Sequence, residues 1–149
     1  MAASSLYEHF RGKDDLFLAL HAELWHAFAG TLAEPVPAGL SRRHALELLV
    51  SHQLRVAAAW RDTLLVFPVV AACPRLAQAV RSGAERYLLA LATWLYRHTG
   101  VARADAADAA AVVAGIIHAF TQRWLRRGAR GDPSVLAPRV AHYVTAALA

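Results

Sequence analysis

The chain has 149 residues, which is enough for one domain with its own hydrophobic core. Hydrophobic residues make up 57% of it and charged residues only 18%, a composition that excludes an intrinsically disordered chain. The formal net charge of +5 favours anionic partners such as nucleic acid, although 16 basic residues against 11 acidic ones do not by themselves define a nucleic-acid-binding surface.

Cysteine content and the distribution of charge exclude two further classes. Cys73 is the only cysteine, so no intrachain disulfide forms and nothing indicates an oxidising compartment. Charged residues between Glu8 and Asp15 interrupt the first part of the sequence, which is not the pattern of a signal peptide. The longest apolar run, residues 64–73, is too short to span a bilayer. We therefore expect a cytoplasmic protein without a membrane segment.

Apolar residues recur with a helical period along the chain, and the predicted elements follow in order. A short helix is expected over residues 2–9, and Gly12 ends the turn behind it. A second helix is predicted over residues 13–33, where leucine or phenylalanine stands at every fourth position from 16 to 32. The segment 34–39 contains two prolines and a glycine, so we expect it to form a loop.

The middle of the chain continues with helices. Ser41 is a suitable N-cap for a third helix, because its short hydroxyl side chain can accept a bond from a free backbone N–H. Residues 60–72 form a further apolar segment, which Pro68 kinks or splits. A long helix is predicted over residues 74–98.

The last part of the chain holds two more predicted helices. Residues 105–127 are periodically apolar up to Gly128, a residue type that often ends a helix. Asp132 and Pro133 suit the start of a final amphipathic helix that reaches about residue 148. No segment alternates with the period of a strand, so the predicted fold class is all-α.

One stretch near the start carries a family resemblance. Residues 4–17 read SSLYEHFRGKDDLF, and they match without gaps the pattern with which the helix-turn-helix of TetR-family transcriptional regulators ends. The matching residues are Ser5, Leu6, Tyr7, His9, Phe10, Lys13 and Leu16. The chain therefore resembles a TetR-family regulator, and the resemblance implies a TetR-like C-terminal ligand-binding helical bundle behind a helix-turn-helix head.

The resemblance implies roles in DNA binding for this stretch. In a helix-turn-helix, one helix lies in the major groove while neighbouring groups hold phosphates. The residues implied to approach phosphate oxygens are Ser5, Tyr7, His9 and Lys13. Those implied to meet base edges are Ala2, Ala3 and Ser4, of which the alanines offer only apolar contact.

The family has two further helices ahead of this stretch, which the given sequence does not contain. A helix of about eight residues without a surface to pack on is marginal in water. We therefore expect residues 1–12 to be a remnant of the DNA-binding domain, and we expect this chain not to bind an operator specifically. Met1 stands where the family commonly has a valine after a turn glycine, so a start site assigned too late is our hypothesis.

The resemblance divides the rest of the chain into a connecting helix, residues 13–33, and a ligand-binding and dimerisation domain, residues 34–149. Large rings and a few polar groups are candidates for the wall of a mostly apolar cavity, with ordinary core or surface positions as the alternative for each. The candidates are His52, Gln53, Trp60, Phe67, Tyr87, Trp94, His118 and Phe120. We expect the effector to be a small apolar or aromatic molecule.

The resemblance also implies a homodimer, in which the helices 105–127 and 132–148 pair with their copies as a four-helix bundle. Small side chains offer a face of close approach on the first of these helices, and apolar side chains offer the other half of the contact. The expected contact residues are Ala110, Ala114, Gly115, His118, Val140, Tyr143, Val144 and Leu148.

The sequence lacks the motifs of catalysis and metal binding. There is no His-Glu-x-x-His, no cysteine cluster, no glycine-rich phosphate loop and no Gly-x-Ser-x-Gly, so we expect no enzyme, metal or cofactor. The predicted function is a TetR-type DNA-binding regulator, a ligand-responsive repressor that binds operator DNA in its full-length form. The alternative is a dimeric helical small-molecule-binding protein without operator activity. Four arginines between residues 123 and 130 leave a third option, nonspecific contact with nucleic acid, beside that of a solvated helix end.

Overall fold

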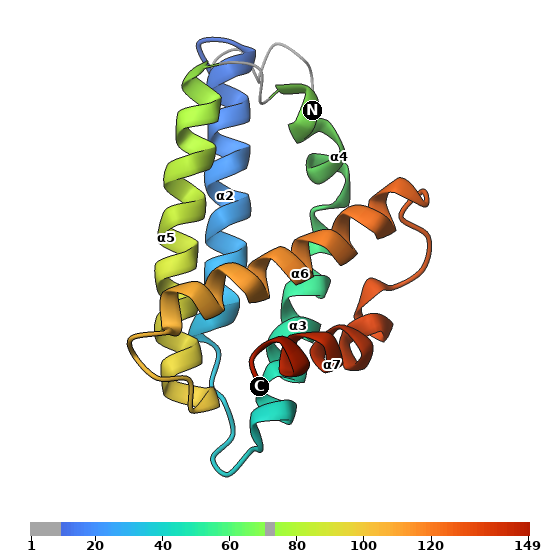
Figure 1. The fold of residues 1–149 in the computed structure, drawn as a ribbon. Coiled ribbons are helices and arrows are strands. Elements are labelled where there is room, and N and C mark those ends of the chain that lie inside the picture. The colour runs from blue at the N-terminus through green and yellow to red at the C-terminus, as the bar shows by residue number, and fades with distance from the viewer. Residues whose placement is uncertain (1–9, 71–73) are drawn as a thin grey trace.

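The structure is a computed structural model that describes residues 10–70 and 74–149, with the backbone alone for residues 67–70. These parts of the chain are helical and contain no strand, which confirms the predicted all-α class (Figure 1). The elements are α2 (Lys13–Ala33), α3 (Arg42–Ala59), α4 (Arg61–Val70), α5 (Pro74–Thr99), α6 (Ala106–Arg126), the 3-10 turn η1 (Pro133–Leu136) and α7 (Ala137–Ala147). The helix predicted over residues 2–9 lies outside the described residues.

Side-chain caps start two of these elements as predicted. The hydroxyl of Ser41 accepts a hydrogen bond from the backbone N–H of His44 at 3.3 Å, which caps α3. The carboxylate of Asp132 accepts from the backbone N–H of Ser134 at 2.8 Å. The turn behind Asp132 is 3-10 rather than α, however, because Pro138 has no N–H for the Ser134 carbonyl. The last α-helix is therefore shorter than predicted.

Helices α2 and α5 lie side by side along most of their length, and α6 crosses them (Figure 1). Helix α7 packs against α3 and α6 at the other end of the molecule. Helix α4 continues the path of α3 after a break at Trp60, whose backbone leaves the helical conformation. The long helices thus surround a space between α2, α5, α6 and the α3–α4 segment.

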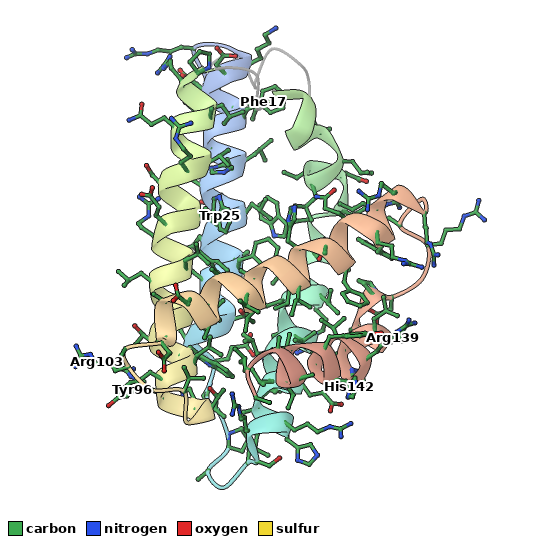
Figure 2. All side chains as sticks on the ribbon, viewed as in Figure 1. Phe17, Trp25, Tyr96, Arg103, Arg139 and His142 are labelled. Carbon is green, nitrogen blue, oxygen red and sulfur yellow. The ribbon has the colours of Figure 1, made fainter. Side chains whose placement is uncertain are left out.

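The hydrophobic core lies where α3, α5, α6 and α7 meet. Every predicted inward residue of α3 is buried, namely Leu46, Leu49, Val50 and Leu54. Leu91 and Leu95 of α5 and Val113 of α6 are buried against them. Polar and charged side chains such as Tyr96, Arg103 and Arg139 point away from the body (Figure 2).

The residues of α6 predicted to meet a second copy of the chain lie partly in the core and partly at the surface. Ala110 is fully buried in the core, and Ala114, Gly115 and His118 line a cavity. On α7, Val140 and Val144 are likewise fully buried. Ala110, Val140 and Val144 thus pack within the chain, whereas Gly115 and His118 stay exposed, and the homodimer remains a prediction. The outward apolar positions are Val112 and Tyr143, which are 42% and 47% exposed.

Helix α2 has the length and apolar composition that would cross a membrane. In the structure it lies along α5, and His21, Leu24, Trp25 and Phe28 face the same cavity. Asp14 and Asp15 stand in its first turn, where the helix dipole favours carboxylates. Part of the apolar surface of α2 therefore has partners within the chain.

Candidate ligand-binding site

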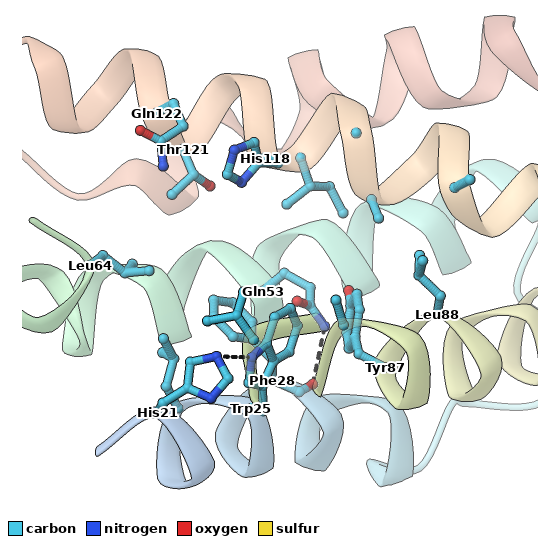
Figure 3. A pocket seen from close by; sticks show the side chains of 17 residues that line it. His21, Trp25, Phe28, Gln53, Leu64, Tyr87, Leu88, His118, Thr121 and Gln122 are labelled. Atoms are coloured by element: carbon cyan, nitrogen blue, oxygen red, sulfur yellow. Dashed lines mark hydrogen bonds between the residues drawn. The ribbon is translucent and has the colours of Figure 1, made fainter. Parts of the chain in front are cut away.

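A cavity of about 510 Å³ lies between the helices and opens to solvent where Ala111, Gly115 and His118 of α6 are exposed. Helices α2, α3, α4, α5 and α6 all contribute side chains to its wall (Figure 3). Its volume falls within the range of small-molecule sites, roughly 300–1,000 Å³. A hollow of this size lined from five helices is a natural place for a ligand.

The wall of the cavity is mostly apolar. Its aliphatic part consists of Leu24, Leu64, Val80, Ala84, Leu88, Ala111, Ala114, Gly115 and Ile117. Its rings are Trp25, Phe28 and Tyr87, and its remaining polar groups are His21, Gln53, His118, Thr121 and Gln122. Among the described lining residues there is no Asp, Glu, Lys or Arg, so the cavity offers no permanent charge to a bound molecule.

Three aromatic rings form one side of the cavity. The ring centroid of Tyr87 lies 5.5 Å from that of Trp25 and 6.4 Å from that of Phe28. Gly83 makes this packing possible, since a Cβ atom at that position would lie only 2.5 Å from the indole of Trp25. The ring of Trp25 therefore lies directly against the backbone of α5, and the aromatic side of the cavity is held in place.

His21 extends the aromatic side and is held as a neutral imidazole. Its Nε2 accepts a hydrogen bond from the indole Nε1 of Trp25 at 2.6 Å, so this nitrogen carries no proton. Burial lowers the pKa of His21, and the positive charge of Arg86 lowers it further. At neutral pH His21 therefore adds no positive charge to the cavity.

Gln53 reaches the cavity from α3 and is tied to α2. Its Nε2 donates to the hydroxyl of Thr31 at 2.5 Å and to the carbonyl oxygen of Phe28 at 3.2 Å. Thr31 in turn donates to the same Phe28 carbonyl at 2.8 Å. Figure 3 shows the Gln53 amide with its nitrogen directed at Phe28. The amide is thus held in one orientation beside the aromatic rings.

Comparison with known proteins gives one relevant likeness. No family model matches the chain, and no curated protein matches it. The crystal structure of a transcriptional regulator, FadR from Bacillus subtilis in complex with stearoyl-CoA, superposes on it with a TM-score of 0.75 at 19% sequence identity. The superposition covers 97% of this chain and 81% of that one. The chain shares its fold with a transcriptional regulator.

Three of the residues predicted from the sequence to bind a ligand come together in this regulator-like body. Gln53, Tyr87 and His118 line the cavity from α3, α5 and α6. Gln53 and Tyr87 are buried, whereas His118 is exposed and stands at the rim. These residues are far apart in the sequence, and the crossing of α6 over α2 and α5 brings them to one space.

Other predicted residues lie outside the cavity wall. His52 contacts the carboxylate of Glu34, with Nδ1 and Oε2 2.7 Å apart. Trp94 is a core residue whose ring packs on His98 at a centroid distance of 5.0 Å. Trp60 occupies the C-cap of α3 and is half-buried. None of these three side chains lines the cavity, although each is predicted to contact a ligand.

The remaining predictions concern the far face of α6 and the start of the chain. Phe120 packs on Tyr143 at a centroid distance of 5.8 Å, on the side of α6 that faces away from the cavity. The side chain of Phe67 lies outside the described residues. Lys13 is exposed and begins α2. The other residues implied to bind DNA also lie outside the described residues, and they are Ala2, Ala3, Ser4, Ser5, Tyr7 and His9.

Sequence reasoning missed the contribution of α2. Residues 13–33 are predicted as a connecting helix, yet His21, Leu24, Trp25 and Phe28 form a large part of the cavity wall. Their spacing of three and four residues places them on one helix face, and this pattern could have indicated that the helix contributes to the cavity wall. The division of the chain at residues 12 and 33 stays a prediction.

Proposed function

We propose that the chain is the effector-binding body of a ligand-responsive transcriptional regulator of the TetR type, acting in the cytoplasm as a repressor. The observation that carries the proposal is the uncharged, largely apolar cavity of about 510 Å³. It supports a ligand because the fold around it is shared with FadR, whose solved structure contains stearoyl-CoA. The seven matching residues between Ser5 and Leu16 support the TetR type.

Helix α2 gives the proposal a physical route from effector to DNA. The segment implied to bind operator DNA leads directly into α2 at Lys13. Two turns further on, the same helix carries His21, Leu24 and Trp25, which line the cavity. A ligand that displaces these side chains shifts α2, and with it the segment ahead of Lys13, provided that it binds the two arrangements with different affinity.

We further propose a homodimer through the outward faces of α6 and α7. These faces carry a shallow apolar depression of about 360 Å³ with the rings of Phe120 and Tyr143 in contact. Ile116, Ala119 and Ala147 complete its lining. Exposed apolar surface on paired helices is a common basis of two-fold assembly, and Tyr143 belongs both to this depression and to the contact that the sequence predicts.

The effector site is tested by titrating the neutral apolar dye Nile red into the chain and following its fluorescence. The wild type should bind the dye saturably, with the blue-shifted emission of an apolar environment. Ala114→Trp fills the cavity from α6 and should abolish this binding, whereas Ala107→Trp, on the exposed start of the same helix, should retain it. Absence of saturable binding by the wild type, or equal binding by the Ala114 variant, would overturn the proposal.

The regulator is distinguished from its alternative, a helical binding protein without operator activity, by selection from a pool of random DNA. Enrichment of one sequence, with an affinity that Nile red alters, supports the regulator. Dye binding without enrichment of any sequence favours the alternative. Affinity for all sequences that falls steeply with salt indicates nonspecific contact through the arginines between residues 123 and 130.

A further inference from the structure

Two buried polar side chains in the cavity wall each have a polar atom to which no described residue is hydrogen-bonded. Gln53 is 1% exposed and Tyr87 is 7% exposed, so neither side chain is hydrated as a surface residue would be. Both line the cavity, and both adjoin Phe28. The free polar atoms of Gln53 and Tyr87 are not enclosed by protein, so whatever occupies the cavity, water or a ligand, completes their hydrogen bonding.

The bonding network fixes which end of the Gln53 amide faces the cavity. Thr31 donates its one hydroxyl hydrogen to the carbonyl oxygen of Phe28, so it accepts the hydrogen bond from Gln53. The Nε2 of Gln53 donates one hydrogen to the hydroxyl oxygen of Thr31 and the other to the same carbonyl oxygen of Phe28. A flipped amide would place its oxygen against the carbonyl oxygen of Phe28, which is repulsive. The Oε1 of Gln53 is thus an acceptor that no described residue engages.

Tyr87 supplies the complementary donor. No described residue bonds its hydroxyl, and the rings of Trp25 and Phe28 hold it at 5.5 Å and 6.4 Å between centroids. Burial raises the pKa of Tyr87, so the hydroxyl keeps its proton at any physiological pH. In Figure 3 this hydroxyl points away from α2 and toward α6, across the cavity.

The surroundings of this pair disfavour a charged group. The described lining carries no Asp, Glu, Lys or Arg, and His21 is held neutral by burial and by the bond from Trp25. A carboxylate placed here would lose its hydration without gaining a counter-ion, and its two oxygens would meet the acceptor of Gln53. A group that both donates and accepts a hydrogen bond while staying neutral fits the pair.

From this arrangement we infer that the cavity selects a neutral, largely apolar effector that carries a hydroxyl group. The hydroxyl donates to Oε1 of Gln53 and accepts from the hydroxyl of Tyr87, while the rest of the molecule lies against the aromatic and aliphatic walls. The inference rests on the proposed effector site and narrows it to a ligand class. Gln53 and Tyr87 are then the residues that distinguish an alcohol or phenol from a hydrocarbon of the same shape.

The inference is tested with matched probes that compete with Nile red. The probes are biphenyl and its para-hydroxy, para-methoxy and para-carboxylate derivatives. The hydroxy compound should bind about tenfold more tightly than biphenyl, as two modest hydrogen bonds allow. The methoxy compound can accept from Tyr87 but cannot donate to Gln53, so it should bind at most about threefold more tightly than biphenyl and more weakly than the hydroxy compound. The carboxylate should bind most weakly of the four.

Two variants assign the preference to the pair, with one matched control. Tyr87→Phe removes only the donor and should reduce the preference for the hydroxy compound to about threefold. Gln53→Leu removes the acceptor and should reduce it similarly. Tyr96→Phe makes the same chemical change at an exposed position of α5 and should leave the preference intact. If Gln53→Leu fails to fold after losing its bonds to α2, Tyr87→Phe alone decides.

The outcomes separate this inference from the proposed function. Nile red binding with equal affinity for the hydroxy and methoxy compounds overturns the inference and leaves the effector site in place. A preference that survives unchanged in Tyr87→Phe also overturns it. Failure of the wild type to bind Nile red or any biphenyl overturns the proposed effector site, and the inference with it.

Discussion

The helical glycines Gly83 and Gly30 differ in what lies beside them. A Cβ atom at Gly83 would stand 2.5 Å from the Trp25 indole, whereas one at Gly30 would have no neighbour within 4 Å. Alanine favours a helix over glycine by about 1 kcal/mol, so the same substitution carries the same intrinsic gain at both sites. The difference between the two variants therefore isolates the contact with Trp25.

We predict that Gly83→Ala destabilises the fold and weakens ligand binding, whereas Gly30→Ala stabilises the fold by up to about 1 kcal/mol. Overpacking at Gly83 costs about 1–3 kcal/mol and pushes the Trp25 ring toward the cavity. Urea unfolding followed by tryptophan fluorescence measures the stability, and Nile red titration measures the binding. Equal stability of the two variants would show that Trp25 does not pack on α5 as described.

His21 gives the stability of the fold a pH dependence. Its pKa is lowered in the folded chain, while in the unfolded chain it stays near 6.5. As the pH falls below 6.5, the unfolded chain therefore takes up a proton that the folded chain does not, which favours unfolding. The stabilisation from this group is complete above that pH and decreases as the pH falls toward the lowered pKa.

We predict that the urea midpoint decreases between about pH 8 and about pH 5.5, and that His21→Leu reduces this decrease. The variant cannot take up the proton, so its folded and unfolded states bind protons alike at this position. His26→Gln, at an exposed position of the same helix, is the matched control and should keep the wild-type pH dependence. An unchanged pH dependence in His21→Leu would contradict the account of this residue.

At the scale of elements, local sequence signals predict where most helices begin and end. They predict less well which helices form the cavity wall. The period of apolar residues, the cap at Ser41 and the position of Asp132 predict most of the observed helices to within a few residues. Caps and periodicity act within a turn or two, so they can be read from the sequence. The 3-10 turn ahead of α7 departs from prediction because Pro138 breaks the bonding ladder.

The cavity follows from the sequence only in part. Gln53, Tyr87 and His118 line the cavity, whereas Trp94, an aromatic residue seven positions after Tyr87 on the same helix, lies in the core. Which aromatic ring faces a hollow depends on how far apart two helices stand, and that distance is set by residues remote in the sequence, such as Gly83 against Trp25. The pattern of residue types along a single sequence does not reveal that distance.

The cap of α3 provides a prediction at the same scale. Ser41→Ala removes the bond to the His44 backbone N–H and should destabilise the chain by about 1 kcal/mol. Ser51→Ala, in the interior of the same helix, should be neutral or slightly stabilising, because alanine is the better helix former. Thermal or urea unfolding of both variants measures the difference, and equal stabilities would show that the cap contributes nothing.

At the scale of the whole molecule, the outward faces of α6 and α7 predict a dimer. Light scattering should give twice the chain mass of 16.2 kDa. Tyr143→Glu places a charge in the apolar depression and should shift the mass toward that of the monomer, since an unpaired charge in an interface core is costly. Tyr96→Glu makes the same change at another exposed tyrosine and should leave the mass at that of the dimer. A monomeric wild type at micromolar concentration would contradict the assembly.

The central claim is that an effector binds inside the body, beside Trp25, and the indole N–H signals of the four tryptophans test it directly. The N–H of Trp25 donates to His21 in the cavity wall, whereas that of Trp124 donates to the Arg130 carbonyl outside it. Nitrogen–proton NMR during titration with para-hydroxybiphenyl should move the Trp25 signal and leave those of Trp94 and Trp124 in place. Movement of the Trp94 or Trp124 signal with that of Trp25 unchanged would contradict the account.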